Sequence, residues 1–121
     1  MRRRCKKHWN VDELIVIIDL YKNEGQIDGH HHDDIAQAIG RYNPTTNSHY
    51  DGAVNRKFGE IAGAISGRRK PLHPGNKIMR LLRKYDGNDV QLRQDTKEAW
   101  ERILSTYNGP TPQIVQNILD S

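Results

Sequence analysis

Apolar residues in this chain recur every three or four positions, the spacing that places side chains on one face of an α-helix. No segment of useful length alternates apolar and polar residues as a half-buried β-strand would. With 121 residues, the chain is long enough for one core of modest size. The pattern therefore predicts a small all-α domain of five to six helices.

The first predicted helix spans residues 11–23. Asn10 precedes it and Glu13 follows three positions later, which is the pattern of a capping box. Trp9 and Leu14 have the spacing of a hydrophobic staple around that cap. Within the helix one apolar stripe is expected, formed by Leu14, Ile17, Ile18 and Tyr21, and Gly25 offers a stop.

The second predicted helix is short and ends at Gly40. Asp33 or a residue before it is expected to cap this helix, because short polar side chains accept hydrogen bonds from the first turn. Its inward face is formed by Ile35, Ala36 and Ile39. A loop rich in turn-forming residues follows over 43–48.

The third predicted helix has one apolar and one polar face. Ser48 and Asp51 are its candidate caps, and Asn55 and Arg56 lie on the polar face. A basic loop over 67–71 comes after it. The apolar positions, spaced by three and four residues, are Tyr50, Val54, Phe58, Ile61 and Ile65.

Three further helices are expected in the second half of the chain. A basic helix at 76–85 precedes a break at 86–89 and a long helix at 89–107. Thr111 is the expected cap of a final amphipathic helix with Pro112 at its first position. The expected inward residues are Ile78, Leu81, Leu82, Tyr85, Leu92, Ala99, Trp100, Ile103, Leu104, Tyr107, Ile114, Val115, Ile118 and Leu119.

These elements predict three parts of the chain. Residues 1–8 form a basic N-terminal tail, and 9–108 form the helical domain. Residues 109–121 form a C-terminal amphipathic helix that packs on the domain or on a partner.

Charge is unevenly distributed along the chain. Residues 1–10 hold five basic residues and no acid, and residues 54–84 hold nine basic residues and one acid. Between them, residues 11–53 hold eight acids and two basic residues. A surface polarised in this way suits a polyanion, and nucleic acid is the most common one.

The chain carries no recognisable targeting or anchoring signal. Cys5 is its single cysteine, which excludes a disulfide framework within the chain and agrees with a reducing compartment. The longest apolar run, 14–18, is far too short to span a membrane, and the basic start is not followed by an apolar stretch. We expect a cytoplasmic protein without a membrane partner.

Two short helices, a loop and a third helix with an outward polar face form a helix-turn-helix-like unit. Such a unit predicts double-stranded DNA as the partner, read by the third helix and the loop before it. The candidates for contact with base edges are Asn47, Ser48, His49, Tyr50, Asn55 and Arg56. The candidates for contact with phosphates are Lys57, Arg68, Arg69, Lys70, Lys77, Arg80, Arg83, Lys84, Arg2, Arg3 and Arg4.

Four segments resemble one protein family in order and spacing. They are Trp9–Ile15 with Asp19–Lys22, then Asp34–Arg41, Gly52–Phe58 and Lys97–Trp100. Together they resemble the N-terminal helical domain of HNH-type restriction endonucleases over residues 8–103. That resemblance implies a DNA-recognition domain that precedes a nuclease, and Lys57 matches the lysine of the family's Lys-Leu pair.

The chain departs from that family in two places. Glu60-Ile61 stands where the family usually has Asn-Phe, and the stretch from Gly67 to Trp100 is lengthened by a basic helix. The chain ends where the nuclease domain would begin, so we expect the recognition domain without the nuclease.

No catalytic site is expected. An HNH nuclease needs a ββα-metal arrangement with a general-base histidine, and no histidine of the chain lies in a strand-turn-strand context. Motifs for nucleotide binding or for a Ser-His-Asp triad are also missing from the sequence. No cofactor is therefore expected.

The run His30-His31-His32-Asp33-Asp34 has three interpretations. His30 or His31 could share a helical face with Asp34 and bind zinc, although consecutive residues cannot all face one metal ion. A solvated helix start, with the two aspartates near the positive end of the helix dipole, is the favoured interpretation. A pH-sensitive patch is the third. We expect no metal site.

A protein-interaction module is the alternative function. The acidic residues within 11–53 and the final amphipathic helix could serve a protein partner or a second copy of the chain. Such a protein would regulate or inhibit a nuclease or another DNA-processing protein.

Overall fold

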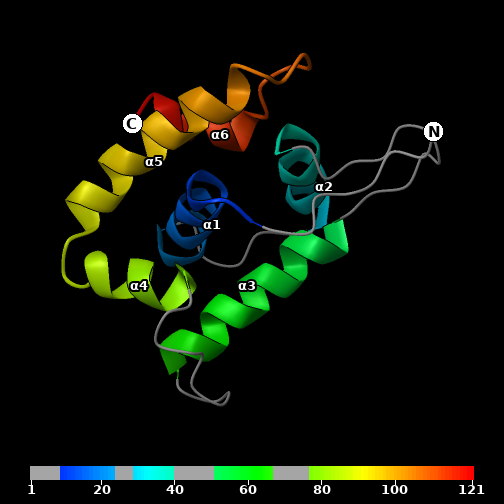
Figure 1. Cartoon of the computed structure of the whole chain (residues 1–121). Helices are drawn as coiled ribbons and strands as arrows, with labels where there is room; N and C mark the ends of the chain where they lie inside the picture. Colours follow the sequence, from blue (N-terminus) through cyan, green and yellow to red (C-terminus); the bar gives the residue numbers. More distant parts are fainter. Residues whose placement is uncertain (1–8, 24–28, 40–50, 67–76) are drawn as a thin grey trace.

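A computed structural model describes residues 9–23, 29–39, 51–66 and 77–121, with every side chain in these ranges except those of 29–33 and 51–53. The described residues contain helices and no strand, which confirms the predicted all-α fold (Figure 1). The helices are α1 (Val11–Asn23), α2 (Gly29–Ala38), α3 (Asp51–Ser66), α4 (Lys77–Lys84), α5 (Asp89–Leu104) and α6 (Gln113–Leu119).

Helix α1 lies at the centre of the molecule. It contacts α3, α4 and α5, and its most extensive contact is with α5 (Figure 1). Eight consecutive residues from Glu13 to Leu20 are buried, so the helix is enclosed on all sides. The prediction of a single apolar stripe is therefore wrong, because the buried surface extends around the whole helix.

The predicted start of α1 is confirmed atom by atom. The side chain of Asn10 accepts a hydrogen bond from the Glu13 amide at 2.8 Å. In return, the Glu13 carboxylate accepts one from the Asn10 amide at 3.1 Å. This reciprocal pair is the capping box, and it satisfies amides that the first turn leaves without a helical partner.

Helix α2 packs on α3 and buries Ile35, Ala36 and Ile39, as predicted. Asp33 is not its cap, because α2 begins at Gly29 and Asp33 lies inside the helix. The alternative, a cap before Asp33, falls outside the described residues. The apolar pattern begins only at Ile35, so the first turn carries no periodic signal that could locate the start.

Helix α3 begins at Asp51, which is thus inside the helix, whereas Ser48 and Tyr50 lie outside the described residues. Val54 and Ile61 are buried and Phe58 packs against the core from a half-buried position. Ile65 is half exposed, contrary to the expected inward position. It lies in the last turn of α3, beyond the buried contact made by Ile61.

Helices α4 and α5 are joined by the tight turn expected at 86–89. Gly87 adopts a φ of 69°, a left-handed conformation that residues with a Cβ rarely take. The side chain of Asn88 caps α5. Helix α5 ends at Leu104, three residues earlier than expected, because the Tyr107 amide bonds the Leu104 carbonyl in a tighter three-residue turn.

Helix α6 packs on α5 and completes the core with Val115 and Ile118. Thr111 is not its cap: Pro112 occupies that position with φ −58° and ψ 143°, and no side chain caps the helix. The Pro112 carbonyl already accepts bonds from the amides of Val115 and Gln116. The turn therefore starts one residue later than the sequence pattern suggested.

Candidate nucleic-acid interface

The outward face of α3 carries the first pair of candidate residues. Asn55 and Arg56 are exposed, directly after the buried Val54. Both side chain types can form two hydrogen bonds with a base edge in the major groove, Asn with adenine and Arg with guanine. The other base-contact candidates, Asn47, Ser48, His49 and Tyr50, lie outside the described residues.

Lys57, the next residue of α3, has a different environment. Its side chain is only 15% exposed, and its Nζ lies 3.0 Å from the Glu60 carboxylate. The same Nζ lies 5.3 Å from the centre of the Trp9 ring, within the range of a cation–π contact. The charge of Lys57 is thus already balanced within the fold.

Helix α4 is strongly amphipathic over only eight residues. Ile78 and Leu81 are buried within it, and Tyr85 is buried directly after it. Every basic residue of α4 is exposed to solvent: Lys77, Arg80, Arg83 and Lys84. The helix therefore presents a compact row of cations, which is the feature expected of a phosphate-binding surface.

Trp9 connects α3 and α4. The Nζ of Lys77 on α4 donates a hydrogen bond to the Trp9 carbonyl at 3.3 Å. Lys57 on α3 contacts the ring of the same residue. The start of α1 therefore lies where α3 and α4 meet. The remaining phosphate-contact candidates, Arg2, Arg3, Arg4, Arg68, Arg69 and Lys70, lie outside the described residues.

The acidic residues of α1 are engaged within the fold. Asp12 forms two hydrogen bonds with Arg102 of α5, at 2.8 and 2.9 Å, which raise the pKa of that guanidinium. Glu13 takes part in the capping box, and Asp19 forms an ion pair with Arg93 of α5 at 3.4 Å. These carboxylates hold α1 in place beside α5.

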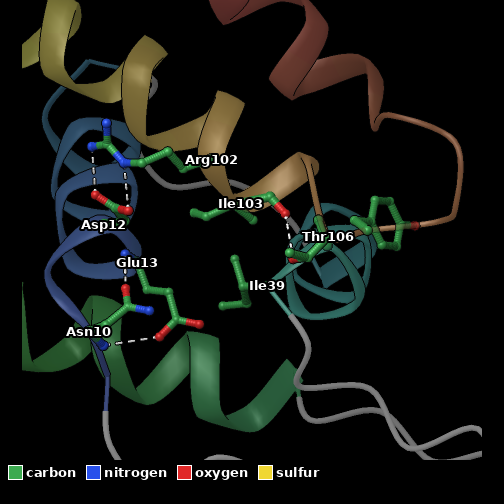
Figure 2. Close-up of a pocket in the computed structure, with 9 residues that line it drawn as sticks. Asn10, Asp12, Glu13, Ile39, Arg102, Ile103 and Thr106 are labelled. Carbon is green, nitrogen blue, oxygen red and sulfur yellow. Dashed lines mark hydrogen bonds and ion pairs between the residues drawn. The ribbon is translucent and has the colours of Figure 1, made fainter.

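A pocket of about 210 Å³ lies between the start of α1, the end of α2 and the end of α5 (Figure 2). The Asp12–Arg102 pair lies on one side of it, Ile103 approaches from the same helix as Arg102, and Ile39 approaches from the end of α2 (Figure 2). The polar side chains that line it from α1 and α5 are those that cap α1 and join it to α5, and the Thr106 hydroxyl donates to the Ile103 carbonyl. The pocket is thus explained by helix packing.

Within the described ranges, no three His, Cys, Asp or Glu side chains are close enough to hold a metal ion. The side chains of His30, His31 and His32 are not among those described, although their backbone forms the first turns of α2. None of the helices in the described ranges is both long and apolar enough to cross a membrane.

Comparison of the chain with protein-family models, curated proteins and solved structures found no match in any of the three.

Sequence reasoning did not identify the role of Trp9 at the junction of α3 and α4. It placed Trp9 beside Leu14 as part of a staple, since a tryptophan before a helix cap usually packs locally. The only available signal was the lysine at position 57 with an acid, Glu60, three positions after it. That spacing indicates a pair within one helix and does not reveal a contact with residue 9.

Proposed function

We propose that this protein is a non-catalytic, helix-turn-helix-like DNA-binding module. It contacts duplex DNA through α3 and the basic segment that follows. One observation carries the proposal: Trp9 contacts a lysine of α3 and a lysine of α4, and every basic residue of α4 is exposed, while Asp12 and Asp19 of α1 are paired with arginines of α5. The sequence resemblance to HNH-type recognition domains agrees with it.

The proposed surface would make two kinds of contact with DNA. Cations of α4, of loop 67–71 and of the tail would neutralise phosphates, giving affinity that falls steeply with salt. Asn55 and Arg56 would supply sequence preference from a helix placed in the major groove. A role in restriction, defence or transcriptional regulation, in the cytoplasm, would follow from occupancy of DNA alone, without catalysis.

The affinity prediction is tested by fluorescence anisotropy with a random duplex across a range of salt concentrations. Arg80→Ala should weaken binding and lower the slope of log affinity against log salt by about 1, the value for one phosphate contact. Lys97→Ala is the matched control, because it removes the same charge from α5, where Lys97 contacts the Ser121 carbonyl. Equal effects of the two substitutions would contradict the α4 assignment.

The basic loop and the polar face of α3 extend the same experiment. Replacing Arg68, Arg69 and Lys70 with Ala should lower the salt slope by up to about 3. Unchanged affinity at low salt would refute that part of the surface.

Asn55→Ala and Arg56→Ala should instead change the preference among duplexes, and an equal loss for all duplexes would argue against base contacts.

A protein-interaction module is the alternative. Its support in the sequence was the acidic residues within 11–53 and the final amphipathic helix, but α6 packs on α5 with Val115 and Ile118 buried. DNA binding is therefore the better supported proposal. Failure of the wild-type protein to bind any duplex at low salt would favour the alternative.

A further inference from the structure

Trp9 contacts one lysine on each of two different helices. Its ring lies 5.3 Å from the Nζ of Lys57 on α3, and its carbonyl accepts a hydrogen bond from Lys77 on α4. The residue is half-buried and also packs against the hydrophobic core. It stands directly before the capped start of α1, so its backbone position is well defined.

The direct contact between α3 and α4 is small, whereas each of them packs on α1. The placement of α3 relative to α4 therefore depends on α1 and on Trp9, the residue before it that contacts both helices. A DNA surface built from two helices needs that placement, because the polar face of α3 must reach base edges while the cations of α4 reach phosphates of the same duplex.

We propose that Trp9 is a positioning residue of the DNA-binding surface. It fixes the position of α3 relative to α4 so that both helices can contact the same duplex. Lys57 acts through the Trp9 ring and is not a phosphate ligand, since its Nζ is paired with Glu60 and its side chain is only 15% exposed. This inference rests on the proposed DNA binding and revises the role expected for Lys57.

The test uses the uncharged substitution Trp9→Leu and anisotropy with a random duplex over a range of salt concentrations. The variant loses no cation, yet the inference predicts binding about three- to tenfold weaker at low salt. It also predicts a salt slope lower by about 1, since fewer cations reach phosphates together. A purely structural role would lower the melting temperature without changing the salt slope of the folded protein.

Tyr107→Leu is the matched control. Tyr107 is another half-buried aromatic residue packed against the core, but it follows α5 and borders the pocket. Its replacement should lower the melting temperature and leave the salt slope at the wild-type value. A Trp9→Leu protein that is folded and keeps the wild-type affinity and slope would overturn the inference.

A double-mutant cycle separates the two roles of Lys57. If Lys57 acts through Trp9, Lys57→Met should weaken binding in the wild-type background and add little in the Trp9→Leu background. Equal losses in both backgrounds would make Lys57 an independent phosphate ligand and refute the inference. Lys57→Arg and Trp9→Phe keep a cation and a ring, so both should retain most of the affinity.

The outcomes remain distinct if a protein fails to fold or to bind. Melting curves show whether the Trp9→Leu protein is folded. If it is unfolded, Lys57→Met and Trp9→Phe are used for the test in its place. In that case, full affinity and slope in Lys57→Met would overturn the inference. Absence of binding by the wild-type protein would refute the proposed function itself, whereas normal binding by the variants would refute only the positioning role.

Discussion

Asp19 is a carboxylate on the central helix with no exposed surface. Its Oδ1 accepts a hydrogen bond from the Asn23 side chain at 2.5 Å, and its Oδ2 lies 3.4 Å from the Arg93 guanidinium. A buried charge is tolerated only when such partners replace the lost water. The pair therefore links α1 and α5, and loss of Arg93 removes a cation from a carboxylate with no exposed surface.

Arg93→Met should lower the free energy of unfolding by about 2 to 4 kcal/mol, because it leaves Asp19 buried without its cation. Lys22→Met is the matched control, since Lys22 joins α1 to Asp89 at the start of α5 through an exposed pair at 3.2 Å. That substitution should cost less than about 1 kcal/mol. Urea denaturation measures both, and equal losses would contradict this account of Asp19.

Tyr85 and Asp95 form a second polar contact at the edge of the core. The buried Tyr85 hydroxyl donates a hydrogen bond to the Asp95 carboxylate at 2.5 Å. This bond is the main cause that lowers the pKa of Asp95. Burial, followed by the same hydrogen bond, raises the pKa of Tyr85. The Tyr85 hydroxyl thus favours the charged form of Asp95, and the charged Asp95 carboxylate favours the protonated form of Tyr85.

Tyr85→Phe should lower the free energy of unfolding by about 1 to 2 kcal/mol near pH 7. Because the folded-state pKa of Asp95 is lowered, its stabilisation is present above the ordinary value of about 4 and is lost as pH falls through the folded-state pKa. The difference between wild type and variant should therefore shrink in acid. Chemical denaturation at several pH values measures it, and a difference independent of pH would contradict the argument.

At the scale of elements, the start of α1 has the strongest local signal. Asn10→Ala removes one half of the capping box and should cost about 1 kcal/mol. Asn88→Ala at the start of α5 is the comparison, because its cap bond to the Gln91 amide is long, at 3.4 Å, and exposed. Thermal melts should show the larger loss for Asn10→Ala, and the reverse order would contradict the geometric ranking.

The candidate site was partly predictable at the element scale. The spacing of Ile78 and Leu81 placed the cations of α4 on the outer face, where they are found. The same reasoning placed Asn55 and Arg56 outward on α3, correctly. It failed for Lys57, because the periodicity of one helix cannot show which residues of another helix approach it.

At the scale of the whole molecule, tertiary packing decides which charged residues form ion pairs and which are exposed to solvent. Acids and bases are both abundant in the sequence, and their blocks alone do not show which ones meet solvent. In the structure, Asp12 and Asp19 of α1 are each paired with an arginine of α5. The basic residues of α4 are exposed to solvent, which agrees with the proposed surface.

The sequence by itself determined the all-α class, the bounds of α1, the capping box at Asn10 and most inward residues, because these depend on neighbours within one or two helical turns. Tertiary structure alone decided that α1 is enclosed on all sides, that α6 closes the core on α5, and that Trp9 joins α3 to α4. These contacts connect residues far apart in the chain, and helical periodicity carries no information about such distances.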